Sequence, residues 1–389
     1  MGNRQGMGVA GLFSGIGGFE LAFEAAGFQN ILLCEIDPVA KYVLEKRFPN
    51  CQLISDVKEI SELPSEVNVL CAGFPCQDLS SAGQKEGIAG TRSSLIKEVF
   101  RILEKKPVEW VVIENVAFML RLKKGQAIKY ITSQLSNLGY KWAYRTVDSA
   151  AFVPQRRERV YIVASLHDDP RNVLLCDDFG CSRFAYEDYD KPASLPVGFY
   201  WTEGRFSIGT ALNAIPPLKA GSTIGIPSSP AIAFTDGLIA TPNIKDAERL
   251  QGFTADWTLP AAECTNPSSR WRLVGNAVTV DVVTWIANRI KTPGLYKSNN
   301  DERIELSDSW PAAAWGANGE IRISNASKWP FENKNGGLDS FLQYPVKPLS
   351  KKAISGFIKR VNEGGLKTPS GFIDSLAMYE KSLEEKGNG

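Results

Sequence analysis

The sequence has little cysteine and almost no histidine, and these shortages exclude several kinds of site. Its seven cysteines are an odd number at irregular spacing, without a Cys-x-x-Cys pair, which argues against a disulfide framework and against structural zinc. His167 is the only histidine, so any Ser-His or Cys-His dyad would have to use it. Because His167 precedes Asp168 and Asp169 after a strand-like run, we expect it in a surface loop, and we expect no metal.

The chain also lacks a long apolar run and a strong net charge. No stretch of about 18 apolar residues occurs, and the N-terminus lacks signal-peptide features, so we expect a cytoplasmic protein without a membrane partner. With 43% hydrophobic and 22% charged residues, the 389 residues are typical of a globular protein with two or more domains. The net charge of +1 carries no global signature of nucleic-acid binding. Basic residues cluster locally at 121–124, 156–159 and 351–352, and a solvated surface suits the first and third clusters.

The fold class follows from the alternation of apolar runs and helical periods between residues 9 and 164. Segments with apolar residues at helical spacing lie at 19–26, 37–44, 95–103 and 128–138. Strands are expected before, between and after them, at 8–13, 31–35, 67–72, 110–114, 140–147 and 160–164. This alternation is typical of an α/β fold.

The pattern changes after residue 166. From 167 to about 241 the sequence is rich in Asp, Gly, Pro, Ser and aromatic residues, which indicates a second domain of irregular, loop-bearing character. Regular patterns return at 246–253 and 277–290. The tail from residue 299 contains two Trp-Pro pairs and a helical stretch near 353–361, and its pattern indicates no role.

A glycine-rich turn and a carboxylate follow the first two expected strands. Gly15 and Gly17 would let the backbone approach a ligand closely, and Glu35 could hold both hydroxyls of a ribose. Glu20 occupies the third glycine position of a G-x-G-x-x-G motif, which disfavours NAD and favours an adenosine cofactor without a pyrophosphate. The glycines alone could equally form a plain tight turn. Asp56 could accept a hydrogen bond from an adenine amino group, or it could be a turn or cap residue.

Four more polar side chains lie next to apolar runs. Cys76 in Gly-Phe-Pro-Cys-Gln stands where a buried strand must turn, and backbone N–H groups there would lower the pKa of its thiol. Glu114 ends the run 110–113, where partial desolvation would raise its pKa, although a structural salt bridge is an alternative. In a strand through Arg157 and Arg159 both guanidinium groups share one face, and each needs an acceptor such as a carboxylate or a substrate oxygen.

Together these groups are the parts needed to alkylate carbon 5 of a cytosine. A thiolate added at carbon 6 turns the ring into a nucleophile, while Glu114 hydrogen-bonds or protonates N3 and an arginine steadies O2. In these motifs the chain resembles the bacterial cytosine-C5 DNA methyltransferases of restriction-modification systems. The matching blocks, in the family's order, are FSGIGGFE (13–20), CEIDP (34–38), SDV (55–57), GFPCQ (73–77), ENV (114–116), QRRERVYIV (155–163), ERLQGF (248–253) and VGNAV (274–278).

The resemblance implies a Rossmann-like, S-adenosylmethionine-dependent methyltransferase fold, a mixed sheet flanked by helices with a smaller irregular target-recognition domain. It makes Cys76 the nucleophile, Glu114 the N3 partner and Arg159 the O2 partner, with Arg157 supporting the site. Gln77 and Ser80 would contact the flipped nucleotide or its phosphate, and the loop 80–92 would close over the DNA. The residues implied for S-adenosylmethionine, and for its product S-adenosylhomocysteine, are Phe13, Gly15, Gly17, Gly18, Glu35, Ile36, Asp56, Val57, Pro75, Asn276 and Ala277.

The same resemblance divides the chain. Residues 1–167 and 273–298 would form the catalytic and cofactor-binding domain, 168–272 the target-recognition domain, and 299–389 an extension of unknown role. Sequence recognition would lie at about 180–244. The implied substrate is double-stranded DNA, the enzyme would be a monomer, and a cognate restriction endonuclease would be a partner in function without a stable complex. Candidates for base or phosphate contact are Arg205, Lys219 and Ser222.

Three alternatives remain beside this interpretation. Methylation of tRNA by the same family is disfavoured because such relatives usually have Pro-Pro-Cys where this chain has Phe-Pro-Cys. A DNA-binding protein without catalysis is disfavoured because Cys76, Glu114, Arg157 and Arg159 are all present. A nicotinamide oxidoreductase with a reactive thiol is opposed by Glu20 in the glycine loop.

Overall fold

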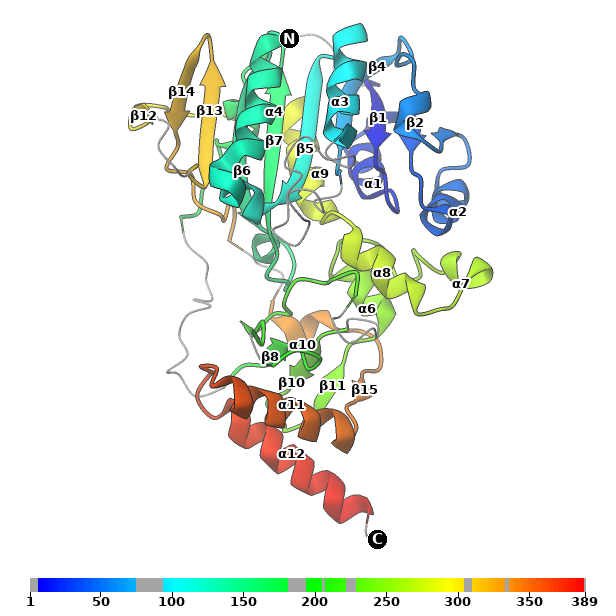
Figure 1. The fold of residues 1–389 in the computed structure, drawn as a ribbon, viewed down its shortest axis with the longest axis vertical. Helices are drawn as coiled ribbons and strands as arrows, with labels where there is room; N and C mark the ends of the chain where they lie inside the picture. The colour runs from blue at the N-terminus through cyan, green and yellow to red at the C-terminus, as the bar shows by residue number, and fades with distance from the viewer. Residues whose placement is uncertain are drawn as a thin grey trace. The chain divides into compact units, whose positions relative to one another are not determined.

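The computed structural model describes residues 6–74, 94–180, 194–204, 207–221, 229–303, 310–332 and 336–387 (Figure 1). The chain divides into two compact units. The first is Met1–Asp148, Glu158–Cys181 and Val278–Phe331, and the second is Ser149–Arg157, Ser182–Ala277 and Glu332–Gly389. The tail that we expected to be one separate extension is therefore divided between the two units.

The first unit is built on a sheet whose described strands follow the order β12-β14-β13-β6-β7-β5-β4-β1-β2-β3. The strands from β3 to β5 in this order run parallel, and β7 is antiparallel to both β5 and β6. The carboxyl ends of the parallel strands therefore meet at one edge, where α/β proteins place their ligands. The strands are β1 (Gly8–Leu12), β2 (Gln29–Cys34), β3 (Gln52–Ile54), β4 (Val67–Ala72), β5 (Trp110–Val116), β6 (Lys141–Asp148), β7 (Glu158–Ser165), β12 (Glu302–Arg303), β13 (Ala313–Ala317) and β14 (Glu320–Ile323).

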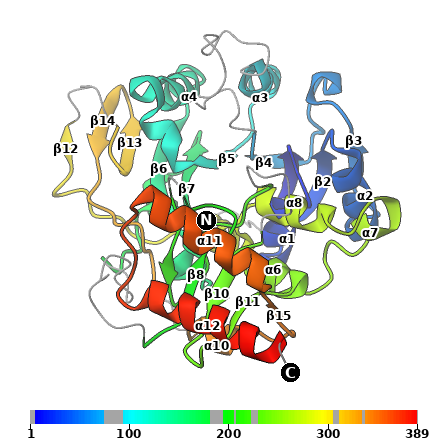
Figure 2. The same cartoon turned by 60° about the horizontal axis from the view of Figure 1, so that its bottom comes forward.

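Helices cover both faces of this sheet (Figure 2). The buried apolar faces of α3 and α4, with Val99 and Ile131, form one core with Leu70 and Val111 of the sheet. On the other face α1 packs on α9. Their bounds are α1 (Gly18–Ala25), α2 (Pro38–Arg47), α3 (Ser94–Lys105), α4 (Gln126–Asn137), α5 (Arg171–Leu174) and α9 (Val280–Lys291), with the short turns η1 (Val57–Glu59), η2 (Ala117–Leu120) and η3 (Leu122–Gly125).

The first part of the tail extends this sheet. Strand β13 pairs antiparallel with β6, and Gly316 allows the close approach because a Cβ there would lie 2.4 Å from the Trp142 ring. The Arg145 guanidinium is fully buried and donates to the main-chain oxygens of Ser327, Leu174 and Asp177. Burying an arginine without such acceptors is costly, and the bond to Ser327 ties the extension to strand β6.

The second unit contains a smaller antiparallel sheet in the order β15-β11-β10-β8-β9. The second part of the tail supplies β15 and helices α11 and α12, and Phe357 and Phe372 pack on Phe199 with ring centroids 4.9 and 5.1 Å apart. The tail is thus part of this unit's core. The strands are β8 (Val197–Phe199), β9 (Ala211–Leu212), β10 (Ala231–Ala233), β11 (Ile239–Thr241) and β15 (Lys347–Pro348). The helices are α6 (Ile244–Arg249), α7 (Ala261–Cys264), α8 (Ser269–Asn276), α10 (Leu338–Phe341), α11 (Lys351–Gly364) and α12 (Phe372–Gly387), with the turn η4 (Ser149–Ala151).

Two features are absent from the part of the chain that the structure describes. None of its helices combines the length and the apolar character needed to cross a bilayer. It also contains no cluster of three or more His, Cys, Asp or Glu side chains able to hold a metal ion.

Candidate active site

The glycine turn after β1 contacts the Glu35 carboxylate through a backbone hydrogen bond. Oε2 of Glu35 accepts a hydrogen bond from the Gly15 N–H at 2.7 Å, and Oε1 accepts one from the Asp37 N–H at 2.8 Å. Gly15 and Gly17 have φ values of +57° and +86°, a conformation that strongly favours glycine. Burial raises the pKa of Glu35, and the two N–H donors hold that rise back. The glycine turn and Glu35 are thus in direct contact, and their role at a cofactor stays a prediction.

Other residues expected at the cofactor differ in exposure. Phe13 has a φ of +59°, which is unusual for a residue with a side chain, and it stands directly before the glycine turn. Ile36 is 70% exposed although its side chain is apolar, so it offers an uncovered surface next to Glu35. Asp56 caps η1 by accepting a hydrogen bond from the Lys58 N–H at 3.0 Å, which agrees with the alternative that it is a turn or cap residue. Val57 is buried in the core between the sheet and α3.

Gly18 is the buried first residue of α1, and the fully buried Glu20 lies two residues further on, in the same first turn. Neither carboxylate oxygen of Glu20 has a hydrogen-bond partner among the described residues. One of these oxygens lies against Gly11 of β1, because a Cβ at Gly11 would be 1.8 Å from it. Burial raises the pKa of Glu20 to about 7. The carboxyl group is therefore protonated in the folded protein at mildly acidic pH.

We expect Glu20→Gln to change how stability depends on pH. The pKa of Glu20 is about 7 in the folded protein against an ordinary value of 4.5, so the free energy of unfolding falls as pH rises between these values. The loss reaches about 3 kcal/mol above pH 7, because one pKa unit corresponds to roughly 1.4 kcal/mol. Urea unfolding at several pH values should show the full decline in the wild type and in an exposed control, Glu62→Gln, and a decline smaller by about 3 kcal/mol in Glu20→Gln, where Glu35 still contributes. An unchanged decline in Glu20→Gln would assign it to other groups.

An ion pair lies at the carboxyl end of β5. Nε of Arg159 lies 3.1 Å from Oε1 of Glu114, and both side chains are largely buried. They come from the neighbouring antiparallel strands β5 and β7, which hold them in fixed register. A Cβ at Gly73 would lie 3.8 Å from the other Glu114 oxygen, so the Gly-Phe-Pro-Cys motif begins beside this carboxylate.

Asn115 is a residue that we did not single out from the sequence. Its Nδ2 donates to the main-chain oxygen of Phe74 at 3.2 Å, and its Oδ1 accepts from the Val116 N–H. The amide therefore ties the end of β5 to the residue directly before Pro75. Its position after Glu114 was the only available signal. The candidates Pro75, Cys76, Gln77 and Ser80, and the loop 80–92, lie outside the described residues.

The structure corrects the placement of Arg157. Strand β7 begins at Glu158, so Arg157 precedes the strand and does not share a strand face with Arg159. Its buried guanidinium donates to the main-chain oxygens of Leu218, Gly275 and Ala277 at 2.8, 3.3 and 2.9 Å. The acceptors that its burial required are backbone carbonyls, two of which, at Gly275 and Ala277, belong to the VGNAV motif.

The remaining candidates lie in the second unit. Asn276 is exposed at the end of α8, and Ala277 is buried. Lys219 pairs with Glu203, and its ammonium lies 4.1 Å from the centroid of the Tyr200 ring. Arg205 and Ser222 lie outside the described residues.

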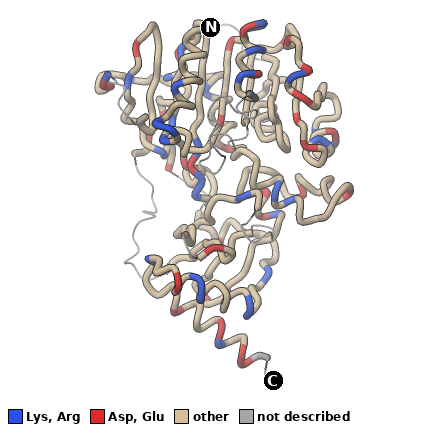
Figure 3. The backbone as a smooth tube through the Cα atoms, in the orientation of Figure 1, with Lys and Arg blue, Asp and Glu red and all other residues tan. Residues whose placement is uncertain are grey.

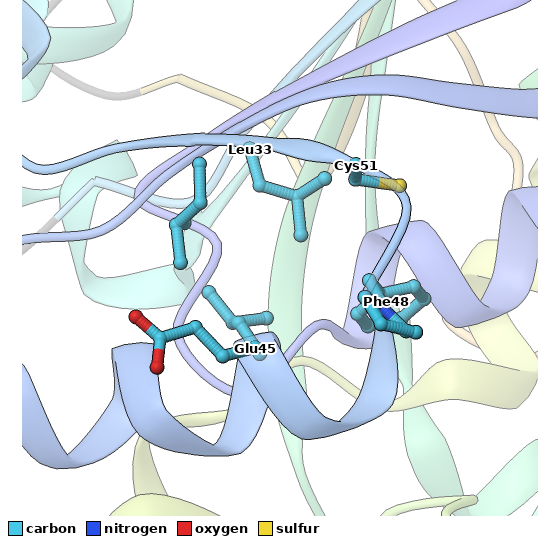
Figure 4. Close-up of a pocket in the computed structure, with 7 residues that line it drawn as sticks. Leu33, Glu45, Phe48 and Cys51 are labelled. Atoms are coloured by element: carbon cyan, nitrogen blue, oxygen red, sulfur yellow. The ribbon is translucent and has the colours of Figure 1, made fainter.

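A small cavity in the first unit is not the cofactor site. Its volume is about 140 Å³, whereas ligand pockets usually span about 300–1,000 Å³. Its lining comes from β2, α2, β3 and the turn before β3, and it includes neither Glu35 nor the glycine turn. Its lining residues, shown in Figure 4, are Leu33, Leu44, Glu45, Phe48, Pro49, Cys51 and Leu53.

Comparison with known proteins defines the class to which this fold and site belong. The family model for C-5 cytosine-specific DNA methylases matches residues 7–215, and the chain belongs to that family. It is accordingly a DNA (cytosine-5) methyltransferase, as the motifs predicted.

Individual relatives support this assignment. The type II methyltransferase M2.BsuMI of Bacillus subtilis is 46% identical over 368 residues, covering 91% of this chain and 93% of that protein. The type II methyltransferase M.MspI of Moraxella is 29% identical over 317 residues, covering 76% and 74%. The Dnmt2 methyltransferase of S. pombe has a TM-score of 0.53 at 17% identity, covering 72% of this chain and 97% of that structure. At that identity the solved structure shows the methyltransferase fold alone, which confirms the predicted fold class.

Proposed function

We propose that the enzyme transfers a methyl group from S-adenosylmethionine to carbon 5 of a cytosine flipped out of a specific duplex DNA sequence. The supporting observation is the Glu114–Arg159 pair beside Gly73, because it gathers two catalytic groups at the start of the motif that carries Cys76. Sequence recognition is assigned to the second unit, at about 180–244.

In the proposed mechanism the Cys76 thiolate forms a bond to carbon 6 of the cytosine. Glu114 hydrogen-bonds or protonates N3, and Arg159 donates to O2, so that both stabilise the charge that develops on the ring. S-adenosylmethionine supplies an electrophilic methyl group, which carbon 5 accepts. The proton on carbon 5 is then lost to water and the N3 proton returns to Glu114, so that the bond to Cys76 breaks, the thiolate leaves and the aromatic ring is restored.

The residues after β1 and β2 fit an adenosine cofactor. Glu35 is fixed by the Gly15 and Asp37 N–H groups, so its carboxylate is positioned to accept hydrogen bonds from ribose hydroxyls. Ile36 adds an exposed apolar surface of the kind that an adenine ring can cover. Asp56 follows the last residue of β3 by two positions, and β3 ends at the same edge of the sheet as β1 and β2.

We expect Glu35→Gln to weaken cofactor binding. The charged carboxylate makes stronger hydrogen bonds to hydroxyls than an amide does, so the Kd for S-adenosylhomocysteine should rise about 10- to 100-fold. Titration calorimetry of the purified protein measures this directly. Glu45→Gln on α2 is the matched control and should bind like the wild type. Equal affinity in Glu35→Gln and the wild type would remove Glu35 from the cofactor site.

The substrate is tested by methyl incorporation. The protein is incubated with labelled S-adenosylmethionine and either duplex DNA or tRNA, and label is counted in each. Incorporation into DNA alone is expected. Incorporation into tRNA alone would contradict the proposal.

A further inference from the structure

The segment that follows Glu114 contains no acidic residue until Asp148. Its first cations, Arg121, Lys123 and Lys124, are exposed. Surface cations elsewhere in this unit often have a local carboxylate, as Arg171 has Asp169. Arg121 and Lys123, by contrast, form no ion pair with any residue that the structure describes. Residues 121–124 are named here the basic segment. Two of its exposed cations, Arg121 and Lys123, therefore carry charge that no carboxylate among the described residues pairs with.

The basic segment starts at the edge of the sheet that carries the catalytic pair. It follows η2, which begins directly after β5, the strand of Glu114, and it runs into the amino end of α4. The amino end of a helix carries partial positive charge, so it adds to the field of the three cations. In Figure 3 the Lys and Arg positions gather at this end of α4.

Packing holds the segment in its conformation. Leu120 and Leu122 are buried on either side of Arg121 and anchor the chain in the core. Lys123 and Lys124 have φ values of 46° and 57°, so both side chains leave the backbone in a left-handed turn that residues with side chains seldom adopt.

Gly125 continues the left-handed turn with a φ of 71°, and it lies directly against Trp310. A Cβ at Gly125 would be 2.2 Å from Cδ1 of Trp310, which is itself buried and packs on Tyr144. Trp310 belongs to the first part of the tail. The tail therefore supports the basic segment as well as extending the sheet.

We propose that the basic segment binds backbone phosphates of the duplex beside the target cytosine. The proposal rests on the proposed function and names a surface for its DNA substrate. The chain as a whole is nearly neutral, so affinity for DNA has to come from local groups of cations placed near the reacting base. Among the described residues this segment combines exposure, absence of acids and a position at the catalytic edge. A merely solvated surface at residues 121–124 would not account for this combination of exposure, absence of acids and position.

The test uses the full chain with Arg121→Gln and Lys123→Gln combined. The matched control is Lys46→Gln with Lys105→Gln, which removes the same charge from exposed positions in the last turns of α2 and α3, at the opposite edge of the sheet. Affinity for a fluorescent duplex is measured by anisotropy between about 50 and 200 mM salt. We expect the variant to bind about tenfold more weakly at the lower salt. Each lost phosphate contact makes the slope of log K against log salt shallower by roughly 0.9. Loss of both contacts should therefore change the slope by about 2.

Further readouts separate binding from folding and from catalysis. The variant should keep wild-type affinity for S-adenosylhomocysteine and wild-type kcat at saturating DNA, with KM for DNA raised. If the double variant does not fold, Arg121→Gln alone lies outside the left-handed turn and should change the slope by about 0.9.

An unchanged slope, an equal loss in the control, or a change seen only with tRNA would overturn the proposal. Failure of the wild type to methylate duplex DNA would instead overturn the proposed function.

Discussion

Cys76→Ala is expected to abolish methyl transfer to duplex DNA while leaving the affinity for S-adenosylhomocysteine nearly unchanged. Without a thiolate to add at carbon 6, carbon 5 of cytosine is too weak a nucleophile to accept the methyl group. Loss of a covalent nucleophile typically lowers rates by roughly 10⁴-fold or more. The measurement is single-turnover incorporation of labelled methyl groups, with cofactor binding determined in parallel by calorimetry.

A matched control removes a different thiol. Cys264 is exposed in the second unit, outside all of the motifs, and Cys264→Ala should retain wild-type turnover. Wild-type rates in Cys76→Ala would refute the assignment of the nucleophile. Loss of cofactor binding in Cys76→Ala would show that the substitution acts on the fold of the site and not on the chemistry.

Glu114→Gln is expected to lower kcat by about 10²- to 10⁴-fold, the usual contribution of a positioned general acid. Glutamine keeps the shape of the side chain and can still accept from Arg159, so the thermal unfolding temperature should change little. An amide cannot transfer a proton to N3, and this is the function that the substitution removes. Rates are compared under single-turnover conditions with saturating DNA.

Glu158→Gln provides the comparison for this second variant. Glu158 is the first residue of β7, and its carboxylate pairs with Lys328 at 2.8 Å, so it undergoes the same chemical change outside the catalytic pair. Its kcat should stay near that of the wild type. If Glu114→Gln and Glu158→Gln are equally active, the ion pair with Arg159 is structural only, which is the alternative that the sequence left open.

Local patterns in the sequence predicted much of the first unit. Asp37 and Pro38 mark the start of α2, and the Asp37 side chain caps it by accepting from the Val39 and Ala40 N–H groups. The pairing of Gly15 with Glu35 was also predictable, because adjacent parallel strands bring their carboxyl ends together. In each case the information lies within a few residues or in one strand–helix–strand repeat.

Contacts between distant residues could not be predicted in the same way. The pairing of β13 with β6 depends on the packing of Gly316 on Trp142, and no local pattern in the tail indicates that partner. Arg157 looked like a strand residue because it shortly precedes the apolar run 160–164. Its position is decided instead by carbonyl acceptors more than 60 residues away in sequence, at Leu218 and beyond.

The most direct test of the covalent mechanism uses a duplex with 5-fluorocytosine at the target base. The target is first located by bisulfite sequencing of DNA from cells that express the enzyme. Because fluorine at carbon 5 cannot leave as a proton does, the bond between Cys76 and carbon 6 should persist after methyl transfer. Mass spectrometry of the denatured complex should then show the methylated base on the peptide that contains Cys76. A duplex that is methylated with cytosine at this position but is not trapped with 5-fluorocytosine, or is trapped on another residue, would contradict the account.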